Sequence, residues 1–317
     1  MTKLSVKKQT DKPRRMSPLE KGIRRDWQLM LLVLPAVACI AIFSYVPMFG
    51  IMYGFQDVPL RGEFLTNDWV GLRWFKQFLS SVYLGRLLKN TFLINFYFLI
   101  FGTICEVGLA VCFNEVKNGP FKKFTQSFTY FPNFISTTVI VGMMMTMLNP
   151  RTGILSLLFQ NVFGMEAVDL FQKPEAFRPM YIISGIWQGA GWGSIIYLGS
   201  INGIDQTLYE AAAIDGAGRL QRIWHITLPG IKPVFVICLI QHIGSLLCHG
   251  SGKIILMYSS AIYETSDVIS TYVYRTGIGG GDYGFSTAVG LFNSIISLIL
   301  LVTANHVAKK VSEVSMF

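Results

Sequence analysis

The chain has 317 residues, of which 52% are hydrophobic and only 14% are charged. An ordinary soluble domain carries about 25% charged residues, so this chain has too little polar surface to cover a water-soluble globule, and we expect the lipid bilayer to be its main solvent. The net charge of +9 is concentrated at one end rather than spread over a surface, which argues against nucleic acid as a partner.

Nine Lys or Arg residues crowd into residues 1–25, directly before a long apolar run. This pattern predicts a basic cytoplasmic N-terminal tail over residues 1–26, because basic residues concentrate on the cytoplasmic side of membrane helices. The apolar run over 29–54 is longer than the hydrophobic part of a signal peptide, and no small-x-small cleavage site ends it. Residues 27–317 are predicted to form one membrane domain.

Runs of about 20 apolar residues, the length that crosses about 30 Å of hydrocarbon, predict an all-α membrane protein with six transmembrane helices. The runs lie near 28–54, 88–114, 124–148, 180–202, 229–254 and 285–306. Prolines interrupt several of them and predict kinked helices packed in a bundle: Pro35, Pro47, Pro132 and Pro233. An even number of spans places both termini in the cytoplasm. In this orientation the inner segments hold 17 of the 27 basic residues, in agreement with the positive-inside rule.

The sequence predicts no catalytic chemistry, no cofactor and no metal site in the chain itself. Five cysteines in apolar stretches are expected to be buried thiols: Cys39, Cys105, Cys112, Cys238 and Cys248. The stretch 250–254 lacks the first Gly and the Ser or Thr of a phosphate-binding loop, and the four histidines form no metal pair with a carboxylate. An integral-membrane transferase is the enzyme alternative, but its catalytic motifs are missing.

A charged, helix-forming loop over residues 205–229 separates the fourth and fifth predicted spans. It has the form Glu-Ala-Ala, three residues, Gly, nine residues, Ile-x-Leu-Pro, with matches at Glu210, Ala211, Ala212, Gly216, Ile226, Leu228 and Pro229. Asp205 can cap a helix over 206–214, and Gly216 permits a left-handed turn after it. A second short helix is expected over 219–225. The alternative is an amphipathic loop that lies on the membrane surface.

This loop resembles the ATPase-docking signature of the permease subunits of type I ABC importers. The chain as a whole resembles the carbohydrate group that includes the maltose permeases, and more closely the LplB-type permeases for polysaccharides and complex oligosaccharides, an alginate importer permease among the candidates. The supporting stretches outside the loop are 90–92, 130–136, 185–193, 203–205, 271–275 and 285–292.

The resemblance implies a type I importer fold with cytoplasmic coupling helices in the bacterial cytoplasmic (inner) membrane. The implied partners are a homologous second permease subunit, two ABC ATPase subunits that hold ATP and Mg, and an extracytoplasmic solute-binding protein that delivers saccharide. This chain would form half of the translocation pathway and work by alternating access. The residues implied to dock the ATPase are Glu210, Ala211, Ala212, Asp215, Gly216 and Arg219.

An ATP-independent carrier or channel is the alternative function. A secondary transporter is expected to show paired broken helices in two halves and a membrane-embedded acid for ion coupling. Glu106 is the only acid well inside a predicted span, so the sequence favours the importer.

A polar stripe is predicted in the fifth span, where His242, Ser245, His249 and Lys253 recur at intervals of three, four and four and so share one helix face. Ionisable groups at membrane depth usually face a bundle interior or a water-filled cavity. The LplB-like pattern has an acid within the stretch that ends at Lys253 here. We therefore expect a path for an anionic oligosaccharide such as a uronate polymer. Among these, alginate-type sugars are the most specific expectation. The alternative is that Lys253 extends to the headgroups and the histidines bond neighbouring helices.

Other polar and aromatic side chains in the spans are further candidates for contact with the saccharide. They are Tyr130, Asn133, Trp187, Gln188, Trp192, Tyr197 and Asn293. Aromatic faces can hold the C–H surfaces of sugars, and amides can bond hydroxyl groups. Trp and Tyr are equally expected as anchors at the membrane interface, and Tyr130, Asn133 and Asn293 as partners in interhelical hydrogen bonds, so both interpretations remain open.

Overall fold

The computed structural model describes residues 18–58, 67–164, 168–247 and 251–312. These residues are mostly helical, and the prediction of an all-α fold is confirmed. Among them, β1 (Gln56–Asp57) and β2 (Asp68–Trp69) form one short antiparallel ribbon. The chain divides into two units, Met1–Met52 and Tyr53–Phe317.

The first unit is one long helical segment. α1 (Pro18–Ile40) continues into η1 (Ala41–Tyr45) and η2 (Val46–Phe55), with a local departure from helical geometry at Asp26 (φ −110°, ψ 18°). From Asp26 onward, the rest of this chain does not bury the large apolar side chains of this segment. This is expected for a helix that is surrounded by lipid or by another subunit. Residues 1–17 of the predicted basic tail lie outside the described residues, so the tail stays a prediction.

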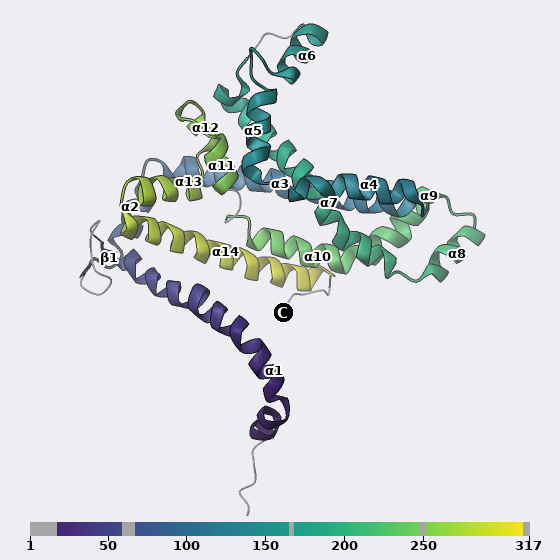
Figure 1. Cartoon of the computed structure of the whole chain (residues 1–317), viewed down its shortest axis with the longest axis horizontal. Coiled ribbons are helices and arrows are strands. Elements are labelled where there is room, and N and C mark those ends of the chain that lie inside the picture. Colours follow the sequence, from purple (N-terminus) through teal and green to yellow (C-terminus); the bar gives the residue numbers. More distant parts are fainter. Residues whose placement is uncertain (1–17, 59–66, 165–167, 248–250, 313–317) are drawn as a thin grey trace, which may run out of the picture. The chain divides into compact units, whose positions relative to one another are not determined.

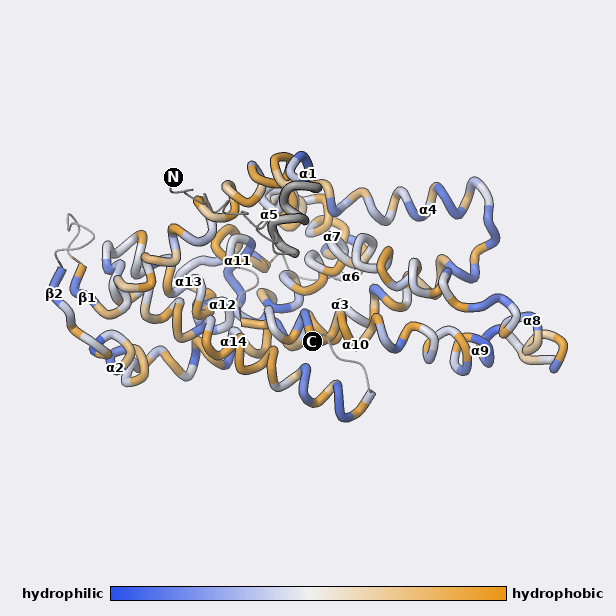
Figure 2. The backbone as a smooth tube through the Cα atoms, turned by 90° about the horizontal axis from the view of Figure 1, so that it is seen from below, coloured by the Kyte–Doolittle hydropathy of each residue, from blue (hydrophilic) through white to orange (hydrophobic). Residues whose placement is uncertain are grey.

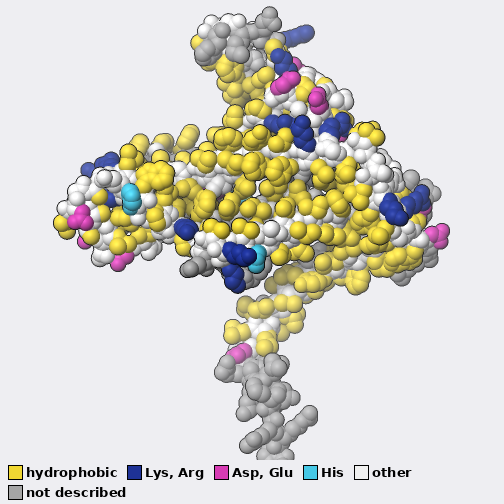
Figure 3. Space-filling view, turned by 180° about the vertical axis from the view of Figure 1, so that it is seen from behind, with side chains coloured by type: hydrophobic (Ala, Val, Ile, Leu, Met, Phe, Trp, Pro, Cys, Tyr) yellow, Lys and Arg dark blue, Asp and Glu magenta, His cyan; other side chains and the backbone are white. Residues whose placement is uncertain are grey.

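The second unit is a bundle built on four long helices. They are α3 (Leu84–Glu115), α7 (Pro174–Asn202), α10 (Leu228–Gly244) and α14 (Tyr283–Ser312). α3 packs along α7, and α10 packs along α14 (Figure 1). Hydrophobic residues dominate the middle of these helices (Figure 2), and they cover most of one face of the body (Figure 3). This surface suits immersion in a bilayer.

Shorter elements join the long helices. They are α2 (Arg73–Leu79), α4 (Pro120–Tyr130), η3 (Phe131–Phe134), α5 (Thr137–Met147), α6 (Ile154–Phe163), η4 (Leu170–Gln172), α8 (Gln206–Ile214), α9 (Arg219–Arg222), η5 (Ile223–Thr227), α11 (Ser251–Met257), η6 (Ser260–Ile262), α12 (Tyr263–Ser266), α13 (Ile269–Tyr274) and η7 (Arg275–Gly279). Figure 1 places α8 and α9 at one end of the bundle and α2 and α13 at the opposite end.

The number of six spans is not confirmed. Within the described ranges, four helical stretches are long and apolar enough to cross a membrane, namely 26–55, 84–115, 219–244 and 283–312. The helices Pro120–Phe134 and Thr137–Met147 give a fifth if the bent pair counts as one span. α7 covers the predicted span at 180–202 but is not among these stretches.

The span predicted over 124–148 bends near Pro132, as its proline predicts, but the bend is a break of 96° between Phe134 and Thr137 that divides it into two helices. Pro132 has no N–H to donate within a helix, which favours a break at this position. A new helix then starts at Ser136, whose Oγ accepts a hydrogen bond from the Val139 backbone N–H at 3.3 Å. This N-cap satisfies a donor that the broken helix leaves free.

The predicted continuous span over 229–254 is also wrong. α10 ends at Gly244, the chain turns through 245–247, and a separate helix α11 begins at Ser251. Ser245 lies at the C-cap, and its Oγ donates to the carbonyls of Gln241 and His242 at 3.0 and 3.1 Å. Such bonds compete with helix continuation, and His242 and Lys253 of the predicted polar stripe lie in different helices.

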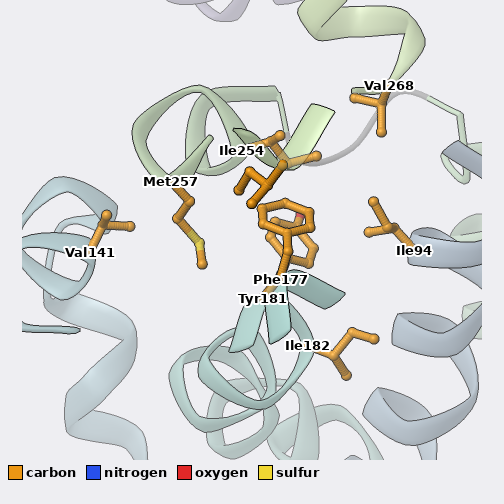
Figure 4. Packing of buried hydrophobic residues seen from close by; sticks show 9 residues of the cluster. Ile94, Val141, Phe177, Tyr181, Ile182, Ile254, Met257 and Val268 are labelled. Atoms are coloured by element: carbon orange, nitrogen blue, oxygen red, sulfur yellow. The ribbon is translucent and has the colours of Figure 1, made fainter. Parts of the chain in front are cut away.

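A hydrophobic core fixes α11 against the bundle. Phe177 and Tyr181 of α7 lie together at its centre, surrounded by Ile94 of α3 and by Ile254 and Met257 of α11 (Figure 4). All five side chains are buried. The short helix after the break therefore packs inward and does not extend α10 through the membrane.

Candidate functional site

The first half of the loop over 205–229 is held in the conformation that its sequence predicts. The Asp205 carboxylate accepts a hydrogen bond from the Thr207 N–H at 3.0 Å and caps α8. This bond holds the pKa of Asp205 below its ordinary value. Gly216 ends the helix with φ +78°, and the N–H of Ala217 returns to the Ala212 carbonyl at 2.8 Å. The closed turn is a Schellman-type helix end.

The second half of the loop differs from the expected separate helix over 219–225. α9 runs through the π-helical turn η5 into α10 without a break. Pro229 cannot donate the usual helical hydrogen bond, and a π turn is one way to absorb such an interruption. The Tyr209 hydroxyl lies 2.9 Å from Thr227 Oγ1, so α8 is tied directly to this continuous helix.

Large apolar side chains on the loop are more than half exposed. Leu208, Ile214, Leu220 and Trp224 are 52%, 87%, 73% and 67% exposed. A pocket of about 360 Å³ lies between α8 and α9. Its lining residues are Ala212, Asp215, Gly216, Ala217, Gln221, Arg222, His225 and Ile226. Apolar side chains around a polar pocket are typical of a surface that another protein covers.

The loop brings all six predicted docking residues to this end of the bundle. Ala212, Asp215 and Gly216 line the pocket itself, whereas Glu210, Ala211 and Arg219 are exposed beside it. The surface therefore offers small residues for close approach and charges of both signs, which suits a protein partner with complementary charges.

Two of the predicted path residues share a cavity inside the bundle. His242 and Ser245 line a space of about 100 Å³ together with Glu106 of α3. Asn95 and Thr103 of α3 add two more polar groups to its wall. The cavity joins α3 to the broken end of α10. His249 lies outside the described residues.

Lys253 does not line this cavity. Its side chain is only 9% exposed, its Nζ donates to the Tyr181 carbonyl at 3.4 Å, and the charge lies 5.3 Å from the centre of the Tyr181 ring. Within the described part of the chain, no carboxylate reaches salt-bridge distance of it. The side chain thus packs inward against α7, and the alternative of an extension to the lipid headgroups is not observed.

Comparison with known proteins decides the family. A family model described as "Binding-protein-dependent transport system inner membrane component" matches residues 99–313, more than half of the chain. The chain belongs to this family. It is thus a membrane component of a transport system, and the family assignment does not favour an ATP-independent carrier or channel.

Relatives of this family align over nearly the whole chain. LplB of Bacillus subtilis (strain 168) is 38% identical over 296 residues, which cover 93% of each protein. The polygalacturonan/rhamnogalacturonan transport system permease protein YteP of the same organism is 39% identical over 302 residues, covering 95% of this chain and 94% of YteP. The resemblance to LplB-type permeases is confirmed.

Two solved structures have the same fold. One is a bacterial ABC transporter involved in the import of the acidic polysaccharide alginate, with a TM-score of 0.85 and 38% identity over 93% of this chain and 100% of that chain. The other is a bacterial alginate ABC transporter in complex with a periplasmic protein that carries an alginate pentasaccharide. Its TM-score is 0.86, with 37% identity over 95% of this chain and 100% of that chain.

Several candidate path residues of this family member are used in packing. Gln188 donates to the Ile135 carbonyl at 3.1 Å, and Asn293 donates to the Leu247 carbonyl at 3.0 Å. Tyr197 is 1% exposed and packs in a cluster with Ala110, Ile201 and Ile231. These contacts agree with the interhelical interpretation of such residues.

The remaining aromatic candidates are more open. Trp187 and Trp192 are each about half exposed, and the Trp192 ring meets Phe134 edge-on at 5.7 Å. Tyr130 meets Phe113 edge-on at 6.0 Å. Asn133 is half-buried in η3.

Sequence reasoning missed a buried ion cluster at the end of the bundle opposite α8. Asp267 is fully buried and binds Arg86 and Arg275. Hydrogen bonds to Asp267 raise the pKa of the Arg275 guanidinium above its ordinary value. In the sequence, the two arginines are seen only to flank apolar segments. This position does not predict that Asp267 is the acid that pairs with both of them.

Proposed function

We propose that this chain is the permease subunit of an ATP-driven, solute-binding-protein-dependent importer of poly- or oligosaccharide. The observation that carries the proposal is the loop over 205–229, which presents uncovered apolar side chains around a pocket of small and charged residues. We place this loop in the cytoplasm against a separate ATPase subunit, with Glu210 as the docking acid and Gly216 as the turn between the two helices.

The connection from the loop to the bundle supports transmission of force. Residues 219–244 form one helical stretch, so a displacement of α9 moves α10 with it. The contact between Tyr209 and Thr227 couples α8 to the same stretch. A rigid-body shift of this kind can switch a permease between two states. The chain itself does no chemistry in this scheme, because ATP and Mg are held by the ATPase.

The proposed assembly follows the family and its relatives. It contains this chain, a homologous second permease subunit, two ABC ATPase subunits and an extracytoplasmic solute-binding protein. The chain spans the bacterial cytoplasmic (inner) membrane with both termini in the cytoplasm, and residues 1–26 form a basic tail before the membrane domain over 27–317. The positive-inside distribution of basic residues supports this orientation.

We further propose that the saccharide is acidic. Lys253 is a buried cation with a backbone carbonyl and an aromatic ring as its neighbours, and buried ionisable groups in membrane proteins usually serve function. The names of YteP and of the two solved transporters refer to polygalacturonan and to acidic alginate. His242 and Ser245 are proposed to lie beside the path on the docking side of Lys253.

The docking proposal is tested by co-purification of the complex. The double variant Glu210→Ala, Gly216→Asp is expected to lose both the ATPase partner and ATP-dependent uptake, while Gln206→Ala on the same loop keeps both. Normal uptake by the double variant with its ATPase still bound would contradict the proposal. Equal uptake of neutral and uronate oligosaccharides of the same length would contradict the proposal of an acidic substrate and would leave the docking proposal unaffected.

A further inference from the structure

A pocket of about 460 Å³ lies between α11, α13, η7 and α14. Pockets of about 300–1,000 Å³ are the usual size of small-molecule sites. Figure 1 shows α13 at the end of the bundle opposite α8 and α9. If the docking loop is cytoplasmic, as proposed above, this pocket lies toward the outer face, where substrate arrives.

The walls of the pocket combine aliphatic side chains with aromatic rings and hydroxyl groups, and none of the described side chains that line it is charged. Tyr274 and Tyr283 are 44% and 42% exposed. Their hydroxyl groups, and that of Ser270 on α13, have no hydrogen-bond partner among the described residues. Two aromatic rings and three available hydroxyls match a sugar ring, which has C–H faces and a rim of hydroxyl groups.

Other polar groups of the pocket hold its shape. Ser286 donates to the Val273 carbonyl at 3.2 Å and ties α14 to α13. Asn293 donates to the Leu247 carbonyl at 3.0 Å and ties α14 to the turn after α10. The pocket is therefore formed before a ligand arrives, which reduces the entropy lost on binding.

The cavity beside Glu106 is a weaker candidate for the same ligand. It has about 100 Å³, which is below the usual size of a ligand site, and its wall carries a carboxyl group. Hydrocarbon is a poor occupant for the larger pocket, because burying its hydroxyls against lipid without partners costs free energy.

We propose that the pocket between α13 and α14 is a binding subsite for a sugar ring of the transported saccharide, with Tyr274 and Tyr283 as its aromatic walls. The proposal rests on the proposed importer function and adds to it a place for the neutral part of an acidic sugar.

Filling the pocket tests the subsite without removing a structural contact. Gly290 lines the pocket, and a Cβ built on it meets nothing within 4 Å. Leucine is also a better helix former than glycine, so Gly290→Leu is expected to fold. Gly199→Leu on α7 is the matched control, since its Cβ also meets nothing within 4 Å.

The probe is a uronate pentasaccharide delivered by the solute-binding protein to the reconstituted complex. Gly290→Leu is expected to raise the concentration for half-maximal uptake by about 10-fold or more, and Tyr283→Ala to raise it by a similar factor, as expected for loss of an aromatic contact. Gly199→Leu should leave it unchanged. Basal ATPase activity and ATPase retention should stay normal in all three variants.

Chemical labelling tests direct occupancy. In a chain whose native cysteines are replaced by alanine, Ser270→Cys should react with a membrane-impermeant maleimide from outside, and the pentasaccharide should slow the reaction. Wild-type uptake kinetics in both Gly290→Leu and Tyr283→Ala, or labelling that the saccharide leaves unchanged, would overturn the subsite. Absence of ATP-dependent uptake by the wild-type complex would instead contradict the importer function itself.

Discussion

Arg275 donates two hydrogen bonds to the carboxylate of Asp267, from Nη2 to Oδ2 at 2.9 Å and from Nη1 to Oδ1 at 3.2 Å. Arg86 of α3 reaches Oδ2 of the same carboxylate at 3.3 Å. Asn90 of α3 donates to the Asp267 backbone carbonyl at 3.0 Å and accepts from Arg178 of α7 at 2.8 Å. One buried acid thus joins α3 and α7 to the segment between α12 and η7.

Replacement of Asp267 by asparagine is expected to destabilise the protein by about 2–3 kcal/mol, because charge-assisted hydrogen bonds to a buried group contribute about that much. Thermal unfolding of the purified protein in detergent measures the loss. Asp57→Asn is the control, since the Arg73–Asp57 pair at 3.4 Å is more than half exposed and such pairs contribute about 0–1 kcal/mol. Equal melting temperatures for the two variants would contradict the assigned role of Asp267.

Close packing of α7 on α4 depends on Gly191. A Cβ on Gly191 would collide with the backbone carbonyl of Thr129, whereas a Cβ on Gly189 meets nothing within 4 Å. Gly191→Ala is therefore expected to destabilise by about 1–3 kcal/mol through overpacking, and Gly189→Ala to be neutral or to stabilise by up to about 1 kcal/mol through helix propensity. The same unfolding assay compares them, and a Gly191→Ala variant as stable as the wild type would show that the helices can separate freely.

The turn after α8 requires glycine at one of two nearby positions. Gly216 has φ +78° and Gly218 has φ −68°, so only the first is unfavourable for an L-residue, by about 1–2 kcal/mol. Gly216→Ala is expected to weaken retention of the ATPase subunit on an affinity column, while Gly218→Ala retains it. The docking geometry assigned to the turn fails if both variants behave alike.

The cap of α8 is expected to respond to pH. The Thr207 N–H lowers the pKa of Asp205 from its ordinary value of 3.8, so the ionised cap stabilises α8 fully above that value and is lost as the pH falls through the lower folded pKa. Hydrogen exchange of residues 206–214, followed from about pH 6 down to about pH 2, should show this loss. Asp205→Asn, an equally good cap without a charge, serves as reference, and parallel profiles for the two proteins would contradict the prediction.

The charge of Lys253 is expected to affect the substrate more than the fold. Lys253→Met removes a buried cation that has no carboxylate partner within the described residues, so stability should be unchanged or higher. Uptake of a uronate oligosaccharide should fall by about 10-fold or more, equivalent to about 1.4 kcal/mol, and uptake of a neutral one should stay the same. Lys253→Arg keeps the charge and should retain part of the uptake. An equal fall for both sugars would assign Lys253 to packing.

Local features of this protein could be predicted because they depend on neighbours in the sequence. The cap at Asp205, the bounds of α8 and the left-handed turn at Gly216 involve residues at most a few positions apart. The all-α class and the family follow from apolar run length and from the spacing of the loop motif. Neither requires knowledge of which helices touch.

The prolines predict kinks, but the size of the bend near Pro132 and the end of α10 at Gly244 could not be predicted in the same way. Counting apolar residues gives one span over 124–148 and another over 229–254, but a proline or a capping serine can be tolerated in a straight helix when neighbours satisfy the freed groups. Only the packing around Pro132 and Ser245 decides that the helix stops. The predicted stripe from His242 to Lys253 failed for this reason, since it assumed 100° of rotation per residue across a break.

By itself the sequence determined that this chain is a membrane protein, that it is helical and that the loop over 205–229 contains a capped helix with a defined turn after it, because these properties arise from composition and short-range geometry. Only the tertiary structure decided that Lys253 turns inward onto Tyr181, that Asp267 meets Arg86 across 181 positions of the chain, and that α13 and α14 enclose an uncharged pocket. The physical reason is that burial and pairing of polar groups depend on which helices approach one another, and residue periodicity within a single helix carries no information about its neighbour.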